Sequence, residues 1–145
     1  MSMQPKYRIQ PRTEVTPEWA YEGSPFFRYA FGGIAQGAQE TVNLKEQIPG
    51  AMGYAPFDEL IIHNDSIRYL YLVWNGVWSA SLWKDIIVVA PTSSMVIEKE
   101  GLTILSVYNA APAAGQNIAS MDVRICFRRK PWDVDEITRR RYFGR

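Results

Sequence analysis

The sequence has little of the chemistry from which most catalytic and metal sites are built. Its 145 residues include one cysteine, Cys126, and one histidine, His63. A single cysteine excludes an internal disulfide and any zinc or iron–sulfur site made of several cysteines. A single histidine excludes, within one chain, a metal site that needs two or more histidines. We therefore predict no metal, no cofactor and no enzymatic activity.

Signals for nucleotide binding, membrane insertion and export are also missing. The sequence contains neither a Gly-rich P-loop nor a GxGxxG motif. Its longest apolar run, Ile86–Ala90, stops at Pro91, far short of the ~20 residues that a membrane helix needs. The first residues, Met1–Lys6, lack the apolar stretch of a secretory signal. We expect a protein without a membrane span or an export address.

Charge is divided unevenly along the chain. Residues 1–13 have a net charge of +3, residues 14–127 have −6 and residues 128–145 have +4, so the chain as a whole has +1. Two basic ends thus flank an acidic middle. Such asymmetry is typical of tails that dock on acidic surfaces, although solvated ends also collect charge for solubility alone.

Composition divides the chain into an N-terminal arm (residues 1–25), a single domain (26–128) and a basic C-terminal tail (129–145). The arm has prolines at positions 5, 11, 17 and 25 and no helical or strand period, so we expect it to be extended. Its spaced aromatic residues, among them Tyr7, Trp19 and Tyr21, need pockets to bind. An extended arm of this length spans ~80 Å. It can therefore reach a neighbouring molecule, the alternative being an arm that folds back over its own sheet.

The middle of the chain reads as a succession of short strands. We predict strands at residues 26–31, 40–46, 58–63, 68–74, 77–83, 86–89, 94–98, 102–108 and 117–128. Asn75-Gly76 predicts a tight hairpin that leads into residues 77–83. In residues 117–128 the alternation places Met121, Val123, Ile125 and Phe127 on one face.

This pattern predicts an all-β fold. The gaps between strands are too short for the helices that a doubly wound α/β fold requires. We predict an antiparallel β-sandwich and prefer the jelly-roll type, and an immunoglobulin-like sandwich stays open.

The basic tail is predicted to form a short helix after Pro131. Asp133 and Glu136 have the spacing of a capping box, with Asp at the N-cap. Arg139, Arg140 and Arg141 then fall in the last turn, which agrees with the helix macrodipole. A helix of this length is marginal alone and needs a partner surface. If the protein contacts nucleic acid, we expect the phosphate contacts to come from this tail only.

Several single residues have an ordinary structural interpretation. We expect His63 at a strand end near the surface, beside the Asn64-Asp65 turn. Asn64-Asp65-Ser66 matches the N-glycosylation sequon, and we interpret the match as chance because no secretory signal accompanies it. Cys126 has no histidine near it in sequence to activate it as a nucleophile.

Four segments, each a strand with its turn, follow one another in the middle of the chain: Leu60–Ser66, Leu70–Gly76, Val88–Ser94 and Leu102–Asn109. This order resembles that of small β-sandwich virion proteins, of jelly-roll type, from bacterial or archaeal viruses, over about residues 58–128. Ala90-Pro91-Thr92 stands where that pattern more usually has a Pro-Gly turn. The resemblance implies a capsid, decoration or tail component that is made in the host cytoplasm and assembled into the virion. It carries over no catalytic residue.

The leading hypothesis is therefore a virion structural protein that binds copies of itself and other virion proteins. Aromatic and arginine side chains dominate the energetics of interfaces. The anchors that we predict lie in the two terminal segments: Tyr7, Trp19, Tyr21, Trp132, Arg139, Arg140, Arg141, Tyr142 and Phe143.

The alternative hypothesis is a carbohydrate-binding module or adhesin head. Trp74, Trp78 and Trp83 lie close together in sequence and would stack on sugars if they were exposed on a sheet face. Buried, they would fill the space between two sheets. Few basic residues are interleaved with these aromatics, which disfavours nucleic-acid binding by the domain itself.

Overall fold

The computed structural model describes residues 19–81 and 86–132. The chain divides into two units: residues 25–129, here called the sandwich unit, and a terminal unit formed by residues 1–24 together with residues 130–145. Of the terminal unit, residues 19–24 and 130–132 are described. The remainder of the predicted arm and the predicted tail helix lie outside the described residues.

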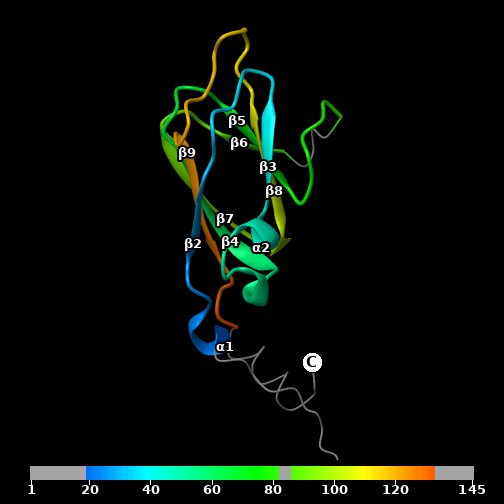
Figure 1. Ribbon diagram of the computed structural model, residues 1–145, viewed down its shortest axis with the longest axis vertical. Coiled ribbons are helices and arrows are strands. Elements are labelled where there is room, and N and C mark those ends of the chain that lie inside the picture. Colours follow the sequence, from blue (N-terminus) through cyan, green and yellow to red (C-terminus); the bar gives the residue numbers. More distant parts are fainter. Residues whose placement is uncertain (1–18, 82–85, 133–145) are drawn as a thin grey trace, which may run out of the picture. The chain divides into compact units, whose positions relative to one another are not determined.

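The described part of the sandwich unit consists mainly of β-strands. These are β2 (Phe27–Ala30), β3 (Gln39–Asn43), β4 (Phe57–Asn64), β5 (Leu70–Trp74), β6 (Ile86–Val89), β7 (Ser93–Leu102), β8 (Ile104–Asn109) and β9 (Val123–Arg128). They form two antiparallel sheets, the first in the order β2-β9-β4-β7 and the second in the order β3-β8-β5-β6. The two sheets are the layers of a β-sandwich (Figure 1), which confirms the predicted all-β antiparallel fold.

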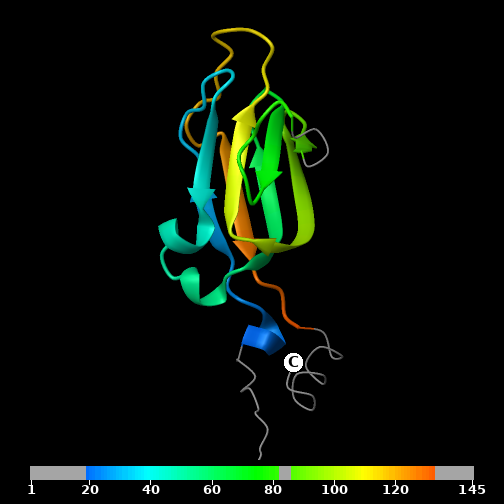
Figure 2. The same ribbon diagram turned by 90° about the vertical axis from the view of Figure 1, so that its right-hand side faces the viewer.

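Strand pairing follows the order of the chain from its outside to its middle. The strand β2 pairs with β9, β3 with β8, β4 with β7 and β5 with β6, and successive pairs alternate between the two sheets. The ladders β4–β9 and β5–β8 complete each sheet. The strands of the sandwich unit thus form one long antiparallel hairpin, with β5–β6 at its tip, rolled up into two layers. Figure 2 faces the second sheet, in which β8 lies between β3 and β5.

This pairing determines where the terminal segments leave the sandwich. Phe27, at the start of β2, lies opposite Phe127, near the end of β9. The residues before β2 and the residues after β9 therefore depart from neighbouring strands at the same end of the first sheet.

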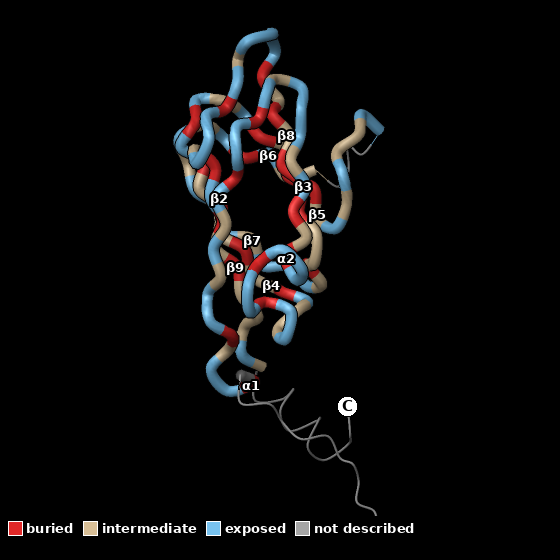
Figure 3. Tube along the Cα trace, viewed as in Figure 1, coloured by how far each residue is buried: buried red, intermediate tan, exposed pale blue. Residues whose placement is uncertain are grey.

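The core lies between the two sheets, and buried residues alternate with less buried ones along β9 (Figure 3). Phe57 and Phe127 make an edge-to-face contact in it, with ring centroids 4.8 Å apart. Fully burying a side chain of this size contributes ~1.5–3 kcal/mol. The core includes Leu60, Ile62 and Ile125 from the first sheet and Val42, Leu72, Leu105 and Val107 from the second.

The strand predicted over residues 40–46 is shorter than expected. The strand β3 ends at Asn43, and α2 (Leu44–Gln47) follows, with a 3-10 turn, η1 (Met52–Tyr54), after it. Asn43 caps α2: its Oδ1 accepts from the Glu46 amide at 3.2 Å, and the Gln47 side chain accepts from the Asn43 amide at 2.5 Å. This reciprocal cap satisfies amides that a continuing strand would have offered to a neighbour.

The predicted tight hairpin at Asn75-Gly76 is wrong, and residues 77–81 form no strand. The partner of β5 is β6, with Val73 opposite Ile86, so the chain does not pair with itself directly across Asn75-Gly76. Asn75 has a positive φ of 58°, as a hairpin turn would require, but its side chain serves another purpose. Its Oδ1 accepts from the amides of Thr103 and Ile104 at 2.8 and 3.1 Å. Asn75 thereby secures the corner where the chain passes from β7 in the first sheet to β8 in the second.

The last predicted strand is also shorter than expected, because β9 begins only at Val123. Met121 has a φ of +70°, which breaks the alternation. Its side chain is exposed, whereas Val123, Ile125 and Phe127 are buried. The expectation that Met121 faces the core with them is therefore wrong.

The predicted arm is not extended throughout. In the terminal unit, α1 (Trp19–Glu22) is a single helical turn. Its Ala20 carbonyl accepts a hydrogen bond of 2.9 Å from the Trp132 amide. Segments from the two ends of the chain therefore join each other within this unit.

Candidate functional site

The anchors predicted in the terminal segments are described only in part. Tyr21 is exposed and Trp132 is half-buried. Trp19 begins α1, and its side chain is not described. The other predicted anchors lie outside the described residues: Tyr7, Arg139, Arg140, Arg141, Tyr142 and Phe143. The hydrogen bond between Ala20 and Trp132 brings the Tyr21 and Trp132 segments together.

The three tryptophans of the alternative hypothesis do not form one surface. Trp74 packs against the core from the end of β5, and its Nε1 donates to the Glu100 carbonyl at 3.1 Å. Trp78 lies in the loop after β5, on the other side of the sheet. Trp83 lies outside the described residues. Only Trp78 is therefore placed among the outward-facing residues of a sheet.

Trp78 stacks on two tyrosines of the second sheet. Its ring is nearly parallel to that of Tyr108, at 8°, with centroids 3.9 Å apart. Tyr71, which lies opposite Tyr108 in the β5–β8 ladder, is 5.8 Å from Tyr108 and 6.3 Å from Trp78 between ring centroids. Offset stacking of this kind contributes ~0.5–1.5 kcal/mol per pair beyond the area that it buries.

Hydrogen bonds hold the loop after β5 against the sheet. The Trp78 amide donates to Gln39 Oε1 at 2.8 Å, and Gln39 Nε2 donates to the Trp78 carbonyl at 3.2 Å. The Gly76 carbonyl accepts from Ser106 Oγ at 2.5 Å. The backbone groups of this loop thus bind polar side chains of β3 and β8 and not the backbone of a neighbouring strand. This explains why residues 77–81 form no strand.

A small hollow lies beside the Trp78 ring. It is lined by Tyr71, Trp78, Ala80 and Ile86 and has a volume of about 190 Å³. Ligand pockets for drug-sized molecules usually exceed ~300 Å³. The hollow therefore suits a single side chain or ring.

The outward side chains of the second sheet, together with Trp78, form what we call the aromatic face. Alternation along the ladders places these outward residues at Gln39, Thr41, Asn43, Tyr71, Val73, Ile86, Val88, Ile104, Ser106 and Tyr108. None of them is charged. This face is polar near β3 and apolar or aromatic over β5 and β6.

The outward side chains of the first sheet form what we call the charged face. They are Arg28, Ala30, Glu59, Ile61, His63, Ser94, Val96, Glu98, Arg124, Cys126 and Arg128. Three arginines and two glutamates give the face a net charge of +1, with His63 in addition.

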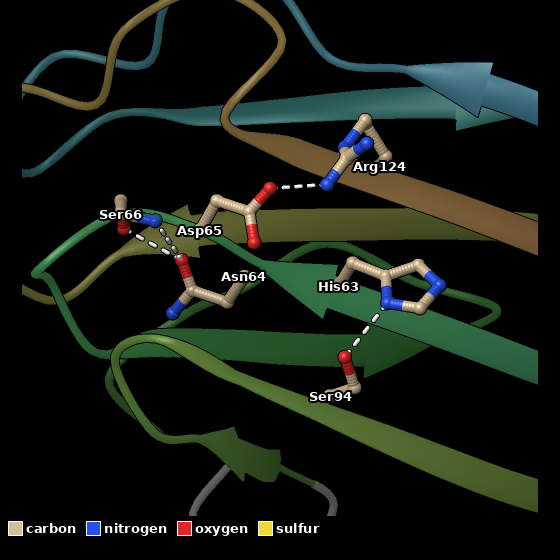
Figure 4. Close-up of polar contacts among 6 residues, drawn as sticks. All are labelled: His63, Asn64, Asp65, Ser66, Ser94 and Arg124. Atoms are coloured by element: carbon tan, nitrogen blue, oxygen red, sulfur yellow. Dashed lines mark hydrogen bonds and ion pairs between the residues drawn. The ribbon is translucent and has the colours of Figure 1, made fainter.

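Ion pairs organise the charged face. Arg124 pairs with Asp65 at the end of β4, and the His63 Nδ1 lies 2.7 Å from Ser94 Oγ (Figure 4). At the other end of the face, Arg128 Nε donates to Glu59 Oε1 at 2.6 Å. The Arg128–Glu59 pair is the less exposed of the two, with 26% and 12% of the side chains accessible against 47% and 58% for Arg124–Asp65.

The fold brings His63 and Cys126 to a common hollow, which their separation in sequence did not indicate. The hollow has a volume of about 470 Å³ and is lined also by Arg28 and Arg124. It is open to solvent. His63 lies opposite Arg124, and Cys126 lies opposite Ile61, so the two residues are diagonal neighbours on adjacent strands.

Asn64 is structural and inaccessible. Its side chain is fully buried, and its Nδ2 donates to the carbonyls of Arg68 and Ala90 at 2.8 and 3.0 Å. Its Oδ1 accepts from the Ser66 amide at 3.0 Å (Figure 4). A sugar cannot be attached to an amide in this position without unfolding the turn.

A tyrosine–carboxylate contact links the two sheets. The hydroxyl of Tyr29, on β2, donates to Glu40 Oε2, on β3, at 2.6 Å. The hydrogen bond to the Glu40 carboxylate, followed by burial and by the negative charge of Glu40, raises the pKa of Tyr29 to about 12. The contact therefore favours the neutral tyrosine.

Within residues 19–81 and 86–132, no three side chains of His, Cys, Asp or Glu group closely enough to hold a metal ion. Over the same ranges, no helix has the length and apolar character that crossing a membrane requires.

The sequence matches no protein-family model, and no curated protein is significantly similar to it.

Sequence reasoning missed most of the aromatic face. Tyr71 and Tyr108 lie in predicted strands, but nothing in the sequence pairs those strands with each other. Gln39 lies just outside the strand predicted over residues 40–46. One signal was available in the sequence, since alternate positions of β5, β6 and β8 carry no charged residue.

Proposed function

We propose that the sandwich is a jelly roll and that the protein is a structural component of a virion, acting through self-association. The single observation that carries the proposal is the strand order, β2-β9-β4-β7 facing β3-β8-β5-β6. A hairpin rolled into two four-stranded sheets is the arrangement of jelly rolls, a fold used by viral capsid proteins among others.

The position of the chain ends also supports assembly. Both terminal segments leave the first sheet from adjacent strands, and they join again through the Ala20–Trp132 hydrogen bond. In this proposal the terminal unit docks as one element on the sandwich unit of a neighbouring subunit.

Charge is complementary between the two units. The terminal unit has eight basic and six acidic residues, a net charge of +2, whereas the sandwich unit has eight basic and nine acidic residues, a net charge of −1. Opposite net charges favour the encounter of one copy's terminal unit with another copy's sandwich. The aromatic and arginine anchors predicted in the terminal segments would then supply most of the affinity.

Deletion of residues 1–25 tests this proposal. Every strand of both sheets lies after residue 25, so the truncated chain should keep its β-sheet circular dichroism and a cooperative thermal transition. Light scattering should show that the full chain forms particles whose mass keeps rising with concentration, and that the truncated chain forms nothing larger than a dimer. A folded, truncated chain that assembles as the full chain does would defeat the docking role of the arm.

Carbohydrate binding is the second candidate, and the observation in its favour is the hollow beside the Trp78 ring. Its lining is almost wholly apolar, and Gln39 already uses its amide oxygen and nitrogen on the Trp78 backbone. Sugar sites need polar side chains that remain available to hydroxyl groups. This second function would be favoured if the wild type bound neutral glycans on an array and a folded Trp78→Ala variant did not.

A further inference from the structure

Exposed apolar side chains continue the aromatic face beyond the Trp78 stack. Val88, on β6, is 50% exposed, and Tyr69, just before β5, is 54% exposed. Val88 lies opposite Tyr71. Tyr69 continues the β5–β8 ladder by one residue, since its carbonyl accepts from the Ala110 amide at 3.0 Å. Contiguous apolar patches of this kind mark interaction sites more often than isolated exposed residues do.

The composition of the aromatic face matches the centre of a protein interface. Interface cores are enriched in Tyr and Trp and depleted of Lys, Glu and Asp. The outward positions of the second sheet carry no charge. Covering them therefore requires no desolvation of an ion, whereas covering the charged face buries arginine and glutamate side chains at considerable cost.

The absence of charge on the aromatic face also indicates which surface of another copy would bind it. The charged face of another copy would lose water from its arginines and glutamates without gaining a counter-ion from the aromatic face. The aromatic face of another copy has no charged side chain that would lose water or need a counter-ion. We propose that two copies of the chain associate through their aromatic faces, in a two-fold contact in which each copy presents the same surface. This inference rests on the self-association in the proposed function and adds to it a second contact surface, separate from the docking of the terminal unit.

The dimensions of the face predict a weak contact. Four strands ~4.8 Å apart and about five residues of ~3.3 Å each cover at most ~300 Å² in projection. Part of this area is unavailable to a partner, because Val73 and Ser106 are already buried. A stable complex buries ~800 Å² per partner. The pairing should therefore depend on concentration, and it becomes strong only where many copies are held together, as in a shell.

The experiment compares two exposed valines on edge strands of the full-length chain. Val88 lies on the aromatic face, and Val96, which is 59% exposed, lies on the charged face. Sedimentation velocity over increasing concentration is measured for the wild type, Val88→Lys and Val96→Lys. We expect Val88→Lys to weaken association at least ~tenfold, which is about 1.4 kcal/mol, and Val96→Lys to change it less than ~twofold. Tyr69→Lys repeats the test on the same face should Val88→Lys fail to fold.

The outcomes separate this inference from the proposed function. Equal association of all three proteins would overturn the aromatic-face contact but leave assembly through the terminal unit intact. Loss of association in Val96→Lys would also overturn it, because the charged face would then be involved. A wild type that stays monomeric at every concentration would overturn both. A monomeric wild type whose tryptophan fluorescence changes with neutral oligosaccharides would assign the face to carbohydrate instead.

Discussion

The two outer faces of the sandwich are built on the same scaffold and have opposite chemistry. Each belongs to a four-stranded antiparallel sheet whose inner side is mostly apolar. The charged face carries three arginines and two glutamates, and the aromatic face carries none. Since the inner side alone buries the core, the outward positions are free to be shaped by what each face contacts.

The faces also differ in the interactions that organise them. Ion pairs between exposed side chains are screened by water and contribute ~0–1 kcal/mol each. Stacked rings and the hydrogen bonds that hold a loop over them exclude water and contribute more. The aromatic face should therefore contribute more to the stability of the monomer.

The largest effect is expected from Trp78→Ala. It removes the stacking on Tyr108 and Tyr71 and part of the cover of the second sheet, so we expect a loss of ~2–3 kcal/mol. Urea denaturation measures this loss. Val96→Ala on the charged face is the control and should change stability by less than ~0.5 kcal/mol. Similar losses in the two variants would remove the energetic contrast between the faces.

An intermediate effect is expected from Tyr29→Phe, which removes the contact between the two sheets. Loss of a hydrogen bond to a carboxylate should cost ~1.5 kcal/mol at neutral pH. The pKa of Tyr29 is about 12 in the folded chain against an ordinary value of 10.0. Between these values the unfolded chain loses a proton that the folded chain keeps, so this contribution to stability is complete below pH 10 and is lost as the pH rises toward 12.

Urea denaturation at pH 9 and pH 11 measures that dependence. Wild-type stability should fall more steeply over this interval than that of Tyr29→Phe, since the other tyrosines and the lysines titrate in both proteins. Parallel losses would show that the Tyr29–Glu40 contact does not hold the proton.

The smallest effects are expected on the charged face. Double-mutant cycles for Arg124–Asp65 should give a coupling energy below ~0.5 kcal/mol that disappears at high salt, because both side chains are about half exposed. The less exposed Arg128–Glu59 pair should give ~1 kcal/mol, and Arg128 also lies 4.7 Å from the Phe26 ring centroid. An equal coupling in both pairs would contradict the role assigned to burial.

Local sequence patterns predicted the positions of most strands but not the residues at which they begin and end. Ile86–Val89 is the range predicted and observed, and β4 differs from its prediction by one residue at each end. Three of the errors fall where a side chain binds backbone. Asn43 caps a helix, Asn75 binds the β7–β8 corner and Gln39 binds Trp78. Each of these bonds replaces a strand ladder with a contact that the sequence pattern does not encode.

The candidate site was less predictable than the fold. The sequence drew attention to Trp74, Trp78 and Trp83 as a group, yet Trp74 packs against the core and Trp78 is stacked outside the sheet. When a residue lies in an irregular loop, the loop's own contacts determine which face of the sheet its side chain covers. Period-two reasoning applies only within a strand.

By itself, the sequence determined the all-β class, through alternation and turn residues, and the lack of any site built from several cysteines or histidines, through composition. Only the tertiary structure decided that Tyr71, Tyr108 and Trp78 meet, that Cys126 and His63 share a hollow, and that one outer face is free of charge. The physical reason is that alternation fixes which residues of a strand share a side. Which strands become neighbours depends on contacts between residues far apart in the chain.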